Sequence, residues 1–279
     1  MLSYRHAFHA GNHADVLKHV VLAELLRYLG SKEKPYWYID THAGAGDYRL
    51  AGEQDGRRAE YRDGIARLWD LHAAPAALAR YLALVRAHNP DGRLARYPGS
   101  PLIAGQLLRA DDRAWLAELH PADFDELQRA TAGRRVRAER RDGFDWLNAL
   151  LPPAPRRALV MIDPSYEVKN DYRRVERALA AALERFATGI YATWYPLLGR
   201  RDAAALPAAL QRIAGPSWLQ VELDVDAARA DGGGLRGSGL FVVNPPYTLP
   251  QALAECLPVL VERLGQGRGA AQRLDYRIP

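Results

Sequence analysis

An apolar run of five residues, Ala158–Ile162, stops abruptly at Asp163-Pro164-Ser165-Tyr166. Five consecutive apolar residues bounded by polar ones are typical of a strand buried on both faces, the kind found in parallel sheets. Open α/β sheets bind their ligands where such strands end. A strand ended by a proline turn is the ordinary explanation of this stretch taken alone. The other strand ends must therefore show whether Asp163 belongs to a site.

A second strand end has a similar character. The strand expected over residues 36–39 runs directly into Asp40-Thr41-His42, and Gly44-Ala45-Gly46 follows. Small residues after a strand let the backbone approach a ligand closely, as in nucleotide-binding loops. A single turn of this kind is a weak signal, because many such turns bind nothing.

Alternating strands and helices predict the fold. Strand-type segments that alternate with helix-type segments cover residues 36–39, 115–117, 136–139, 157–162 and 189–195. Right-handed crossovers between them give one mostly parallel α/β sheet, and residues 1–279 fit a single domain. The first helix is expected to be capped by Asn12 and to end at Gly30. Strands at 218–225 and 239–243 are joined without a long helix, so this last pair is expected to be antiparallel.

The spacing of acidic residues predicts an insertion. In dinucleotide-binding folds the acidic partner of the glycine turn lies roughly 20 residues further on. Here the nearest strand-end candidate is Glu118, so residues 50–96, which have helical spacing, are interpreted as a helical insertion. Ser100 is interpreted as the cap of a helix over 102–108.

Four strand ends carry polar groups: Asp40 with its glycine turn, Glu118, Asp142-Gly143 and Asp163. The carboxyl ends of parallel strands lie at one edge of a sheet, so these groups are expected to converge on one crevice. An NAD site would need a third glycine where Arg49 stands, and there is no phosphate-binding P-loop. S-adenosylmethionine has no phosphates and needs only close backbone approach and acidic ribose partners. Asp40 and Asp47 beside the turn would also suit its positive sulfonium and amino groups.

The totals exclude several classes of protein. No apolar run reaches the length of a membrane span, and the N-terminus lacks the apolar region of a secretion signal, so we expect a cytoplasmic protein. The single cysteine, Cys256, excludes an intramolecular disulfide and a Cys-rich zinc site. His6, His9, His13 and His19 lack a regular pattern with carboxylates, so no metal site is expected.

The net charge of +5 and the many arginines favour a nucleic-acid partner, although an arginine-rich proteome encoded by a GC-rich genome explains them equally well. The arginines near residue 137 could contact RNA or form a solvated face; they are Arg134, Arg135, Arg137, Arg140 and Arg141.

Three segments resemble a known family. They are the N-terminal run from Tyr4 to His19, Asp40-Thr41-His42-Ala43-Gly44-Ala45-Gly46, and Tyr97-Pro98-Gly99-Ser100-Pro101. Together with Asp163-Pro164-Ser165-Tyr166, which resembles the Asp-Pro-Pro-Tyr motif of amino methyltransferases, they look like the RlmJ family. That resemblance runs almost from end to end. It implies a Rossmann-like class I methyltransferase with an inserted helical subdomain, a monomer that methylates N6 of adenine 2030 in naked or partly assembled 23S ribosomal RNA.

The resemblance also implies residue roles. The residues expected to bind the cofactor or line its pocket are His19, His42, Gly44, Gly46, Ser100, Glu118, Asp142, Gly143 and Asp163. Tyr4, Lys18 and Tyr166 are expected to meet the substrate RNA, and residues 1–11 to form a tail that closes over cofactor and base. The catalytic group is Asp163, with Pro164 and Tyr166.

The residue types fit this chemistry. An exocyclic adenine amine is a poor nucleophile because its lone pair is delocalised into the ring. The Asp163 carboxylate and the Pro164 carbonyl can each accept one N–H hydrogen, which favours a pyramidal nitrogen with an available lone pair. Tyr166 would stack on the flipped base, worth roughly 1–3 kcal/mol. Ser165 stands where a second proline is expected and does not fix its own φ, so we expect slower turnover.

A rival motif follows the last of these strands. Asn244-Pro245-Pro246-Tyr247 matches the catalytic motif of DNA adenine and protein glutamine methyltransferases, which gives an alternative function. If its strand is antiparallel, however, the motif lies away from the cofactor edge. A third alternative is an RNA-binding methyltransferase fold that has lost activity, for which Ser165 is the hint.

Overall fold

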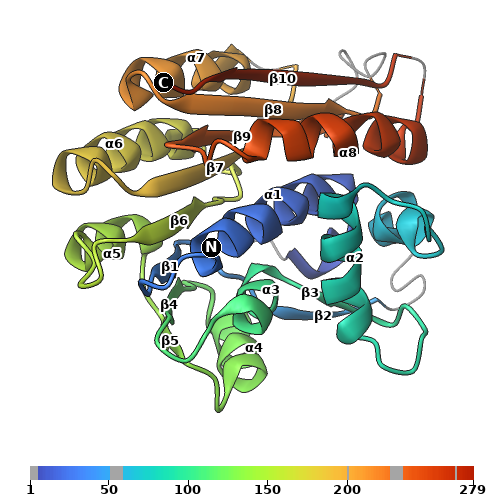
Figure 1. Cartoon of the computed structure of the whole chain (residues 1–279), viewed down its shortest axis with the longest axis horizontal. Helices are drawn as coiled ribbons and strands as arrows, with labels where there is room; N and C mark the ends of the chain where they lie inside the picture. Colours follow the sequence, from blue (N-terminus) through green and yellow to red (C-terminus); the bar gives the residue numbers. More distant parts are fainter. Residues whose placement is uncertain (1–5, 51–58, 200, 227–234, 268) are drawn as a thin grey trace.

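The computed structural model describes residues 6–50, 59–199, 201–226, 235–267 and 269–279. Within them, eight strands form one sheet in the order β10-β8-β9-β7-β6-β1-β4-β5 (Figure 1). The mutually parallel strands are β1 (Trp37–Asp40), β4 (Arg113–Ala117), β5 (Val136–Glu139), β6 (Ala158–Ile162) and β7 (Ile190–Leu197). The mostly parallel sheet predicted from the alternating pattern is confirmed.

The other end of the sheet is antiparallel. It contains β8 (Trp218–Asp224), β9 (Gly237–Val243) and β10 (Ala271–Arg277). Strand β9 runs antiparallel to both β7 and β8, and β10 runs antiparallel to β8. The predicted antiparallel pairing of the strands near 218–225 and 239–243 is therefore confirmed.

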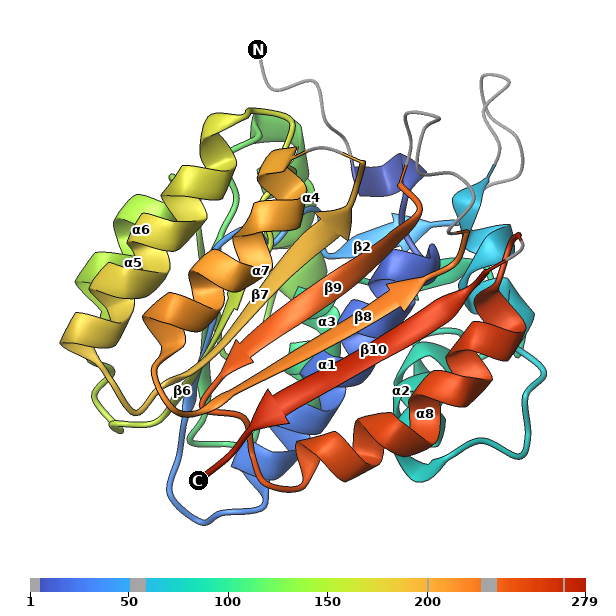
Figure 2. The same ribbon diagram turned by 90° about the horizontal axis from the view of Figure 1, so that it is seen from above.

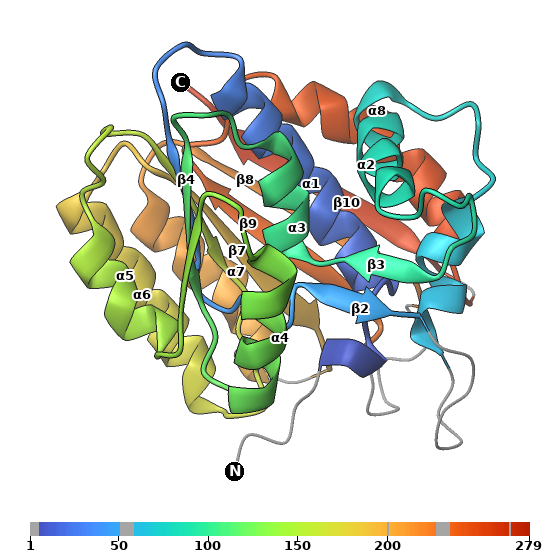
Figure 3. The ribbon, with the colours of Figure 1, turned by 90° about the horizontal axis from the view of Figure 1, so that it is seen from below.

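Helices cover both faces of the sheet (Figure 2). The helices on one face are α5 (Gly143–Leu150), α6 (Asn170–Arg185) and α7 (Arg201–Ala214). Those on the other face are α1 (His13–Gly30), α2 (Ala76–Ala87), α3 (Ser100–Leu107), α4 (Pro121–Thr131) and α8 (Leu249–Leu264) (Figure 3). Each face packs its own apolar core against the sheet.

Helix α1 is the most deeply buried helix of this arrangement. The Asn12 side chain accepts hydrogen bonds from the amides of Ala14 and Asp15, which satisfies donors that have no partner inside the helix. Leu17, Leu25 and the other apolar residues of α1 pack against the sheet and against α2, α3 and α8. Polar residues of α1 near its N-terminus are therefore held inside the protein.

Strand β6 lies at the middle of the sheet between β1 and β7. All five of its residues are buried, as the unbroken apolar run predicts. Parallel pairing brings the ends of β1 and β6 together, since Asp40 is the register partner of Met161. The same pairing places Glu118 and the start of α5 at this edge of the sheet.

The segment between β1 and α3 makes a small structure beside the main sheet. Strands β2 (Asp47–Arg49) and β3 (Arg96–Pro98) form an antiparallel pair, so the chain leaves and returns at the same place. Between them lie the short 3₁₀ helices η2 (Glu60–Asp63) and η3 (Ile65–Leu68), followed by α2. Helix α2 packs against α1 and α8.

Two elements lie beyond the last predicted strand. Helix α8 packs on β8 and β10, and β10 adds an edge strand to the sheet. None of the helices in the described ranges is long and apolar enough to cross a membrane.

Candidate active site

A cavity of about 580 Å³ opens at the carboxyl ends of β1, β4 and β6. Its volume is in the range of sites for small molecules and cofactors. Most of the predicted site residues line it: Lys18, His19, His42, Gly44, Ser100, Glu118, Asp142, Gly143, Asp163, Pro164 and Tyr166. Gly46, Asp40 and Asp47 are not among its lining residues, and Tyr4 lies outside the described residues.

Asp40 does not line the cavity but holds residues beside it in place. Its side chain accepts hydrogen bonds from Tyr38 Oη and Ser100 Oγ, both at 2.7 Å, and its other oxygen accepts one from the His42 amide. Burial raises the pKa of this carboxyl. Asp40 therefore fixes the turn after β1 rather than facing a ligand.

Two expectations for this region are wrong. Ser100 does not cap its helix, because Gly99 occupies the capping position and the Ser100 hydroxyl donates to Asp40 instead. Asp47 does not face the cavity, because its carboxylate pairs with His88 at 2.9 Å and with Arg96. His88 and Arg96 thus pair with the Asp47 carboxylate, whose negative charge was expected to attract a cationic cofactor.

The glycine turn and Glu118 are joined directly. Gly44 has φ +62°, and its amide donates to Glu118 Oε2 at 2.8 Å, while Oε1 of the same carboxylate accepts from the His120 amide. Burial raises the pKa of Glu118. A Cβ on Gly44 would meet the Tyr48 hydroxyl at 2.2 Å, so the turn can pass this point only with glycine.

Gly46 has a supporting role. Its carbonyl accepts a hydrogen bond from the Gly99 amide at 2.8 Å, which ties the glycine turn to the start of α3. The structure thus places Gly46 behind the turn and Gly44 at the cavity.

The start of α5 forms another wall of the cavity. Asp142 caps this helix by accepting the Phe144 amide, and its second oxygen pairs with Arg174 at 2.6 Å. Burial opposes ionisation of Asp142, but Arg174 and the amides lower its pKa overall. Gly143 lies so close to the turn after β1 that a Cβ would meet the Thr41 carbonyl oxygen at 1.9 Å.

His42 and His19 line the cavity with uncharged imidazole rings. Burial lowers the pKa of His42 to about 4, and its ring contacts the edge of Phe144 at a centroid distance of 4.8 Å. Burial lowers the pKa of His19 to about 3. Neither imidazole is charged at neutral pH, so neither would repel a cationic ligand.

His19 also carries an unsatisfied group. Its Nδ1 is 2.7 Å from the Tyr97 hydroxyl, whereas its buried Nε2 has no hydrogen-bond partner among the described residues. A buried polar atom without a partner is costly, so one that lines a cavity indicates a ligand group that pairs with it. The residues present thus fit a cofactor with polar groups, and the two neutral imidazoles would not repel a positive one.

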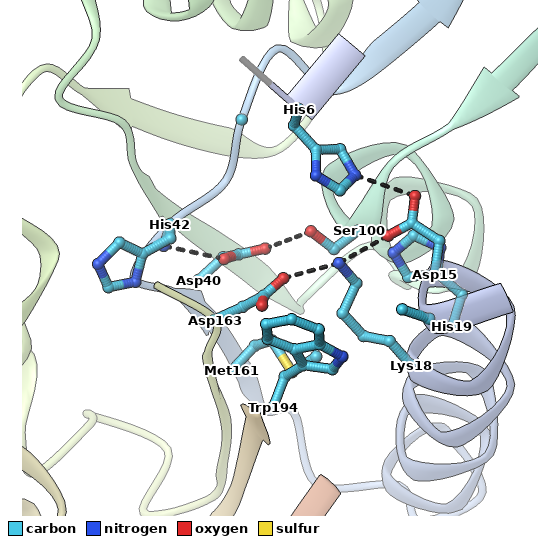
Figure 4. Close-up of polar contacts among 12 residues, drawn as sticks. His6, Asp15, Lys18, His19, Asp40, His42, Ser100, Met161, Asp163 and Trp194 are labelled. Atoms are coloured by element: carbon cyan, nitrogen blue, oxygen red, sulfur yellow. Dashed lines mark hydrogen bonds and ion pairs between the residues drawn. The ribbon is translucent and has the colours of Figure 1, made fainter. Parts of the chain in front are cut away.

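Lys18, which lines the cavity, is held between two carboxylates (Figure 4). Its Nζ lies 2.7 Å from Asp163 Oδ2 and 2.8 Å from Asp15 Oδ1, and its ammonium lies 5.9 Å from the centre of the Trp194 ring. Burial opposes the charge of Lys18, but the two carboxylates raise its pKa well above the usual value. Lys18 is therefore a permanent cation that orients Asp163.

Asp15 anchors this pair. Its Oδ2 accepts hydrogen bonds from the Gly11 amide and lies 2.9 Å from His6 Nε2. Burial opposes its ionisation, yet His6 and Lys18 lower its pKa well below the usual value. Sequence reasoning missed Asp15, although its position three residues before Lys18 places both on one face of α1.

The residues after Asp163 turn sharply into the loop before α6. Tyr166 has φ +54°, unusual for a residue with a side chain, and its hydroxyl donates to the Trp194 carbonyl at 2.6 Å. Its side chain is 3% exposed and packs on Tyr172. Trp194 and Arg174 are two further cavity residues that the sequence did not reveal, because Trp194 lies inside strand β7 and Arg174 inside helix α6 and neither position carries a signal of its own.

The Asn244-Pro245-Pro246-Tyr247 motif lies at the opposite edge of the sheet. Val243, the last residue of β9, is the register partner of Tyr191 near the start of β7. Asn244 donates its side-chain amide to the carbonyls of Ala187 and Gly189. The motif lines a separate cavity of about 300 Å³ that shares no residue with the first. The position inferred for it from strand direction is confirmed.

The histidines near the N-terminus are engaged with carboxylates. His6 pairs with Asp15 and His9 with Glu60, both at 2.9 Å. The described ranges contain no group of three or more histidine, cysteine or acidic side chains placed to hold a metal ion.

The sheet order, the cavity at the parallel strand ends and the acidic partner of its glycine turn define a Rossmann-like, class I S-adenosylmethionine-dependent methyltransferase. The model of the family described as "Ribosomal RNA large subunit methyltransferase D, RlmJ" matches residues 33–277, so the chain belongs to the RlmJ family.

Individual relatives agree with this assignment. The chain is 47% identical over 280 residues to the ribosomal RNA large subunit methyltransferase J of Escherichia coli K12, with 100% of both chains covered. It is 45% identical over 266 residues to the protein of the same name from Haemophilus influenzae, covering 95% of this chain and 94% of the relative. A crystal structure of a Legionella pneumophila protein matches with a TM-score of 0.88 at 35% identity, over 96% of this chain and 98% of that one.

Proposed function

We propose that this protein transfers a methyl group from S-adenosylmethionine to N6 of an adenine in 23S ribosomal RNA, by resemblance adenine 2030. The observation that carries the proposal is Asp163, the first residue of an Asp-Pro-x-Tyr motif, which lines the cofactor cavity and is held there by Lys18. The proposed substrate is naked or partly assembled RNA, and the proposed active form is a cytoplasmic monomer.

In this proposal, different cavity residues contact different parts of the cofactor. Glu118 would hold the ribose hydroxyls, and Asp142 and Gly143 would flank the adenine, with Phe144, which does not line the cavity, packed behind His42. His19 Nε2, buried and unpaired, would meet a polar group of the cofactor. S-adenosylmethionine bound there supplies an electrophilic methyl group.

Asp163 and Pro164 activate the amine. Lys18 holds Oδ2 of Asp163, which leaves Oδ1 to accept an N–H hydrogen of the adenine, and the Pro164 carbonyl accepts the other. This pairing favours a nitrogen whose lone pair is available for attack. Methylation leaves one excess proton on the nitrogen, and Asp163 is placed to accept it. Lys18 thus has a positioning role besides the proposed contact with RNA.

The target base would stack on Tyr166. The hydrogen bond to the Trp194 carbonyl and the packing against Tyr172 hold this ring in one position, so little side-chain entropy would be lost on binding. Residues 1–11, including Tyr4, would close over cofactor and base. The segment 50–96 would be a helical subdomain inserted in the methyltransferase domain, an idea supported by its entry and exit through the paired strands β2 and β3.

The test is methyl transfer from radiolabelled cofactor to 23S transcript, double-stranded DNA and assembled ribosomes, followed by digestion and detection of N6-methyladenosine. We expect transfer to the transcript with wild-type protein and a loss of at least 100-fold with Asp163→Ala. Transfer to DNA alone, or to no substrate despite cofactor binding, would contradict the proposal.

A further inference from the structure

A second groove lies at the opposite end of β4 and β5 from the cofactor cavity. It has a volume of about 560 Å³ and shares no lining residue with that cavity. Four arginines line it, against the single carboxylate of Asp111; they are Arg113, Arg134, Arg135 and Arg137. Arg137 pairs with Glu139, but within the described ranges no ion pair joins the other three to a carboxylate. The groove is therefore strongly positive.

Aromatic rings form one wall of this groove. Trp37 and Trp115 lie on neighbouring strands with ring centres 4.8 Å apart, and both are partly exposed. Arg137, the register partner of Trp115, places its guanidinium 5.5 Å from the centre of that ring. Arginines beside partly exposed tryptophans provide both a charge for phosphates and a flat surface for a base.

The rings and arginines continue toward the cofactor cavity. Trp115 contacts Trp146 at 6.0 Å, and the guanidinium of Arg141, which lines the cofactor cavity, lies 5.5 Å from the centre of the Trp146 ring. Between the groove and Arg141 runs β5, the edge strand of the sheet (Figure 1). Four residues of strand span about 13 Å, so the two sites are within reach of one nucleic-acid segment.

We propose that the groove and the β5 edge bind the RNA backbone that flanks the target adenine, with phosphates on Arg134, Arg135 and Arg137 and an unpaired base against Trp37 or Trp115. Planar guanidinium groups match phosphate oxygens, and sequence-tolerant stacking suits single-stranded RNA. This inference rests on the proposed function, because it assumes that the substrate is RNA. The occupant is nucleic acid rather than an acidic protein segment, because partly exposed indole rings beside guanidinium groups suit a base and a phosphate together.

RNA binding without cofactor provides the test, because it does not depend on methyl transfer. The variant Arg134→Gln/Arg135→Gln/Arg137→Gln is titrated with a labelled 23S fragment at several salt concentrations by fluorescence anisotropy. Log affinity falls as log salt concentration rises, and each lost phosphate contact makes the magnitude of this slope smaller by about 0.7–0.9. We expect the slope to fall by about 2 or more and the affinity to drop at least 10-fold near physiological salt.

A matched control removes three positive charges at the other edge of the sheet. Arg263→Gln/Arg273→Gln/Arg277→Gln alters exposed residues of α8 and β10 and should leave affinity and slope unchanged within 2-fold. Glu139→Gln releases Arg137, and the more distant Arg141, from their shared carboxylate partner and should strengthen RNA binding.

The outcomes separate the inference from the proposed function. Circular dichroism first establishes that the groove variant and Glu139→Gln are folded. If the folded groove variant then binds RNA as well as the control does, or if Glu139→Gln has no effect on RNA affinity, the groove does not bind RNA. Loss of RNA affinity in the groove variant would support the inference even if the wild type methylated no RNA. In methylation assays the groove variant should raise KM and leave kcat near the wild-type value.

Discussion

Two tetrapeptides of similar sequence end two strands of the same sheet and have different surroundings. Asp163-Pro164-Ser165-Tyr166 follows β6, and Asn244-Pro245-Pro246-Tyr247 follows β9. Tyr166 is 3% exposed and lines the cofactor cavity, whereas Tyr247 is 74% exposed and lies beside Tyr28. Each turn contains a residue with φ +54°, Tyr166 in the first and Asn244 in the second.

Strand direction explains the difference. Strand β6 is parallel to β1 and β7, so its end meets the turn after β1 and the N-terminal part of α1. Strand β9 is antiparallel to β7, so its end lies at the other edge of the sheet. A motif can thus match a catalytic pattern and still lie outside the site, because its chemistry depends on the edge that the strand reaches.

The largest expected effect is on methyl transfer. Asp163→Ala removes an acceptor for the adenine amine and one of the two carboxylate partners of Lys18, so we expect the single-turnover rate to fall about 10²–10³-fold. The matched variant Asn244→Ala removes hydrogen bonds to Ala187 and Gly189 and should lower the melting temperature without changing that rate by more than 2-fold. The reverse pattern would move the catalytic role to the opposite edge.

The loss of folding stability at low pH should also originate at the edge of the sheet that carries the cavity, from His19. His19 is 1% exposed and its pKa in the folded state is about 3, against 6.5 for the ordinary side chain. Between these values the unfolded chain binds the proton that the folded protein does not, so stability falls as pH falls. From pH 7 to pH 5 this residue should lower the free energy of unfolding by about 2 kcal/mol.

Chemical denaturation at pH 7 and pH 5 without cofactor measures this effect. His19→Gln should lose roughly 2 kcal/mol less between the two pH values than wild type does. The exposed His72→Gln should behave as wild type. Equal losses for all three proteins would mean that His19 is not the source of acid sensitivity.

The tyrosines of the two motifs should differ in their hydroxyls. Tyr166→Phe removes a buried hydrogen bond to the Trp194 carbonyl and should lower the free energy of unfolding by about 1–1.5 kcal/mol. Tyr247→Phe alters a mostly exposed ring and should have no measurable effect. Urea denaturation of both variants makes the comparison, and equal values would show that the Tyr166 hydroxyl does not anchor the loop.

The smallest effect concerns the third position of each motif. Ser165 does not restrict the backbone as proline does. Ser165→Pro should remove under about 1 kcal/mol of conformational freedom from the loop and thereby raise the single-turnover rate by about 2–5-fold. Pro246→Ser makes the opposite exchange at the other edge and should leave the rate unchanged. An unchanged rate for Ser165→Pro would show that the Asp163 loop is already rigid.

The regular elements and their strand ends could be predicted because they depend on local patterns. The apolar run before Asp163 and the capped helix after Asn12 are both signals within a few residues. Ser100 and Asp47 were misinterpreted because their partners are distant: Asp40 lies 60 residues from Ser100, and Arg96 lies 49 residues from Asp47. A hydroxyl or carboxylate has many possible partners, and only the fold selects one.

The pairing of the sheet also bears on how the protein folds. Strands β8 and β9 pair residues as close in sequence as 224 and 237, whereas β1 pairs with β6 across more than a hundred residues. Contacts between distant residues form slowly, because closing a long loop costs entropy before any contact forms. The antiparallel half of the sheet can therefore form early, while Lys18 and Asp163, 145 residues apart, meet only once the parallel half is assembled. Cofactor binding would then report the final step of folding.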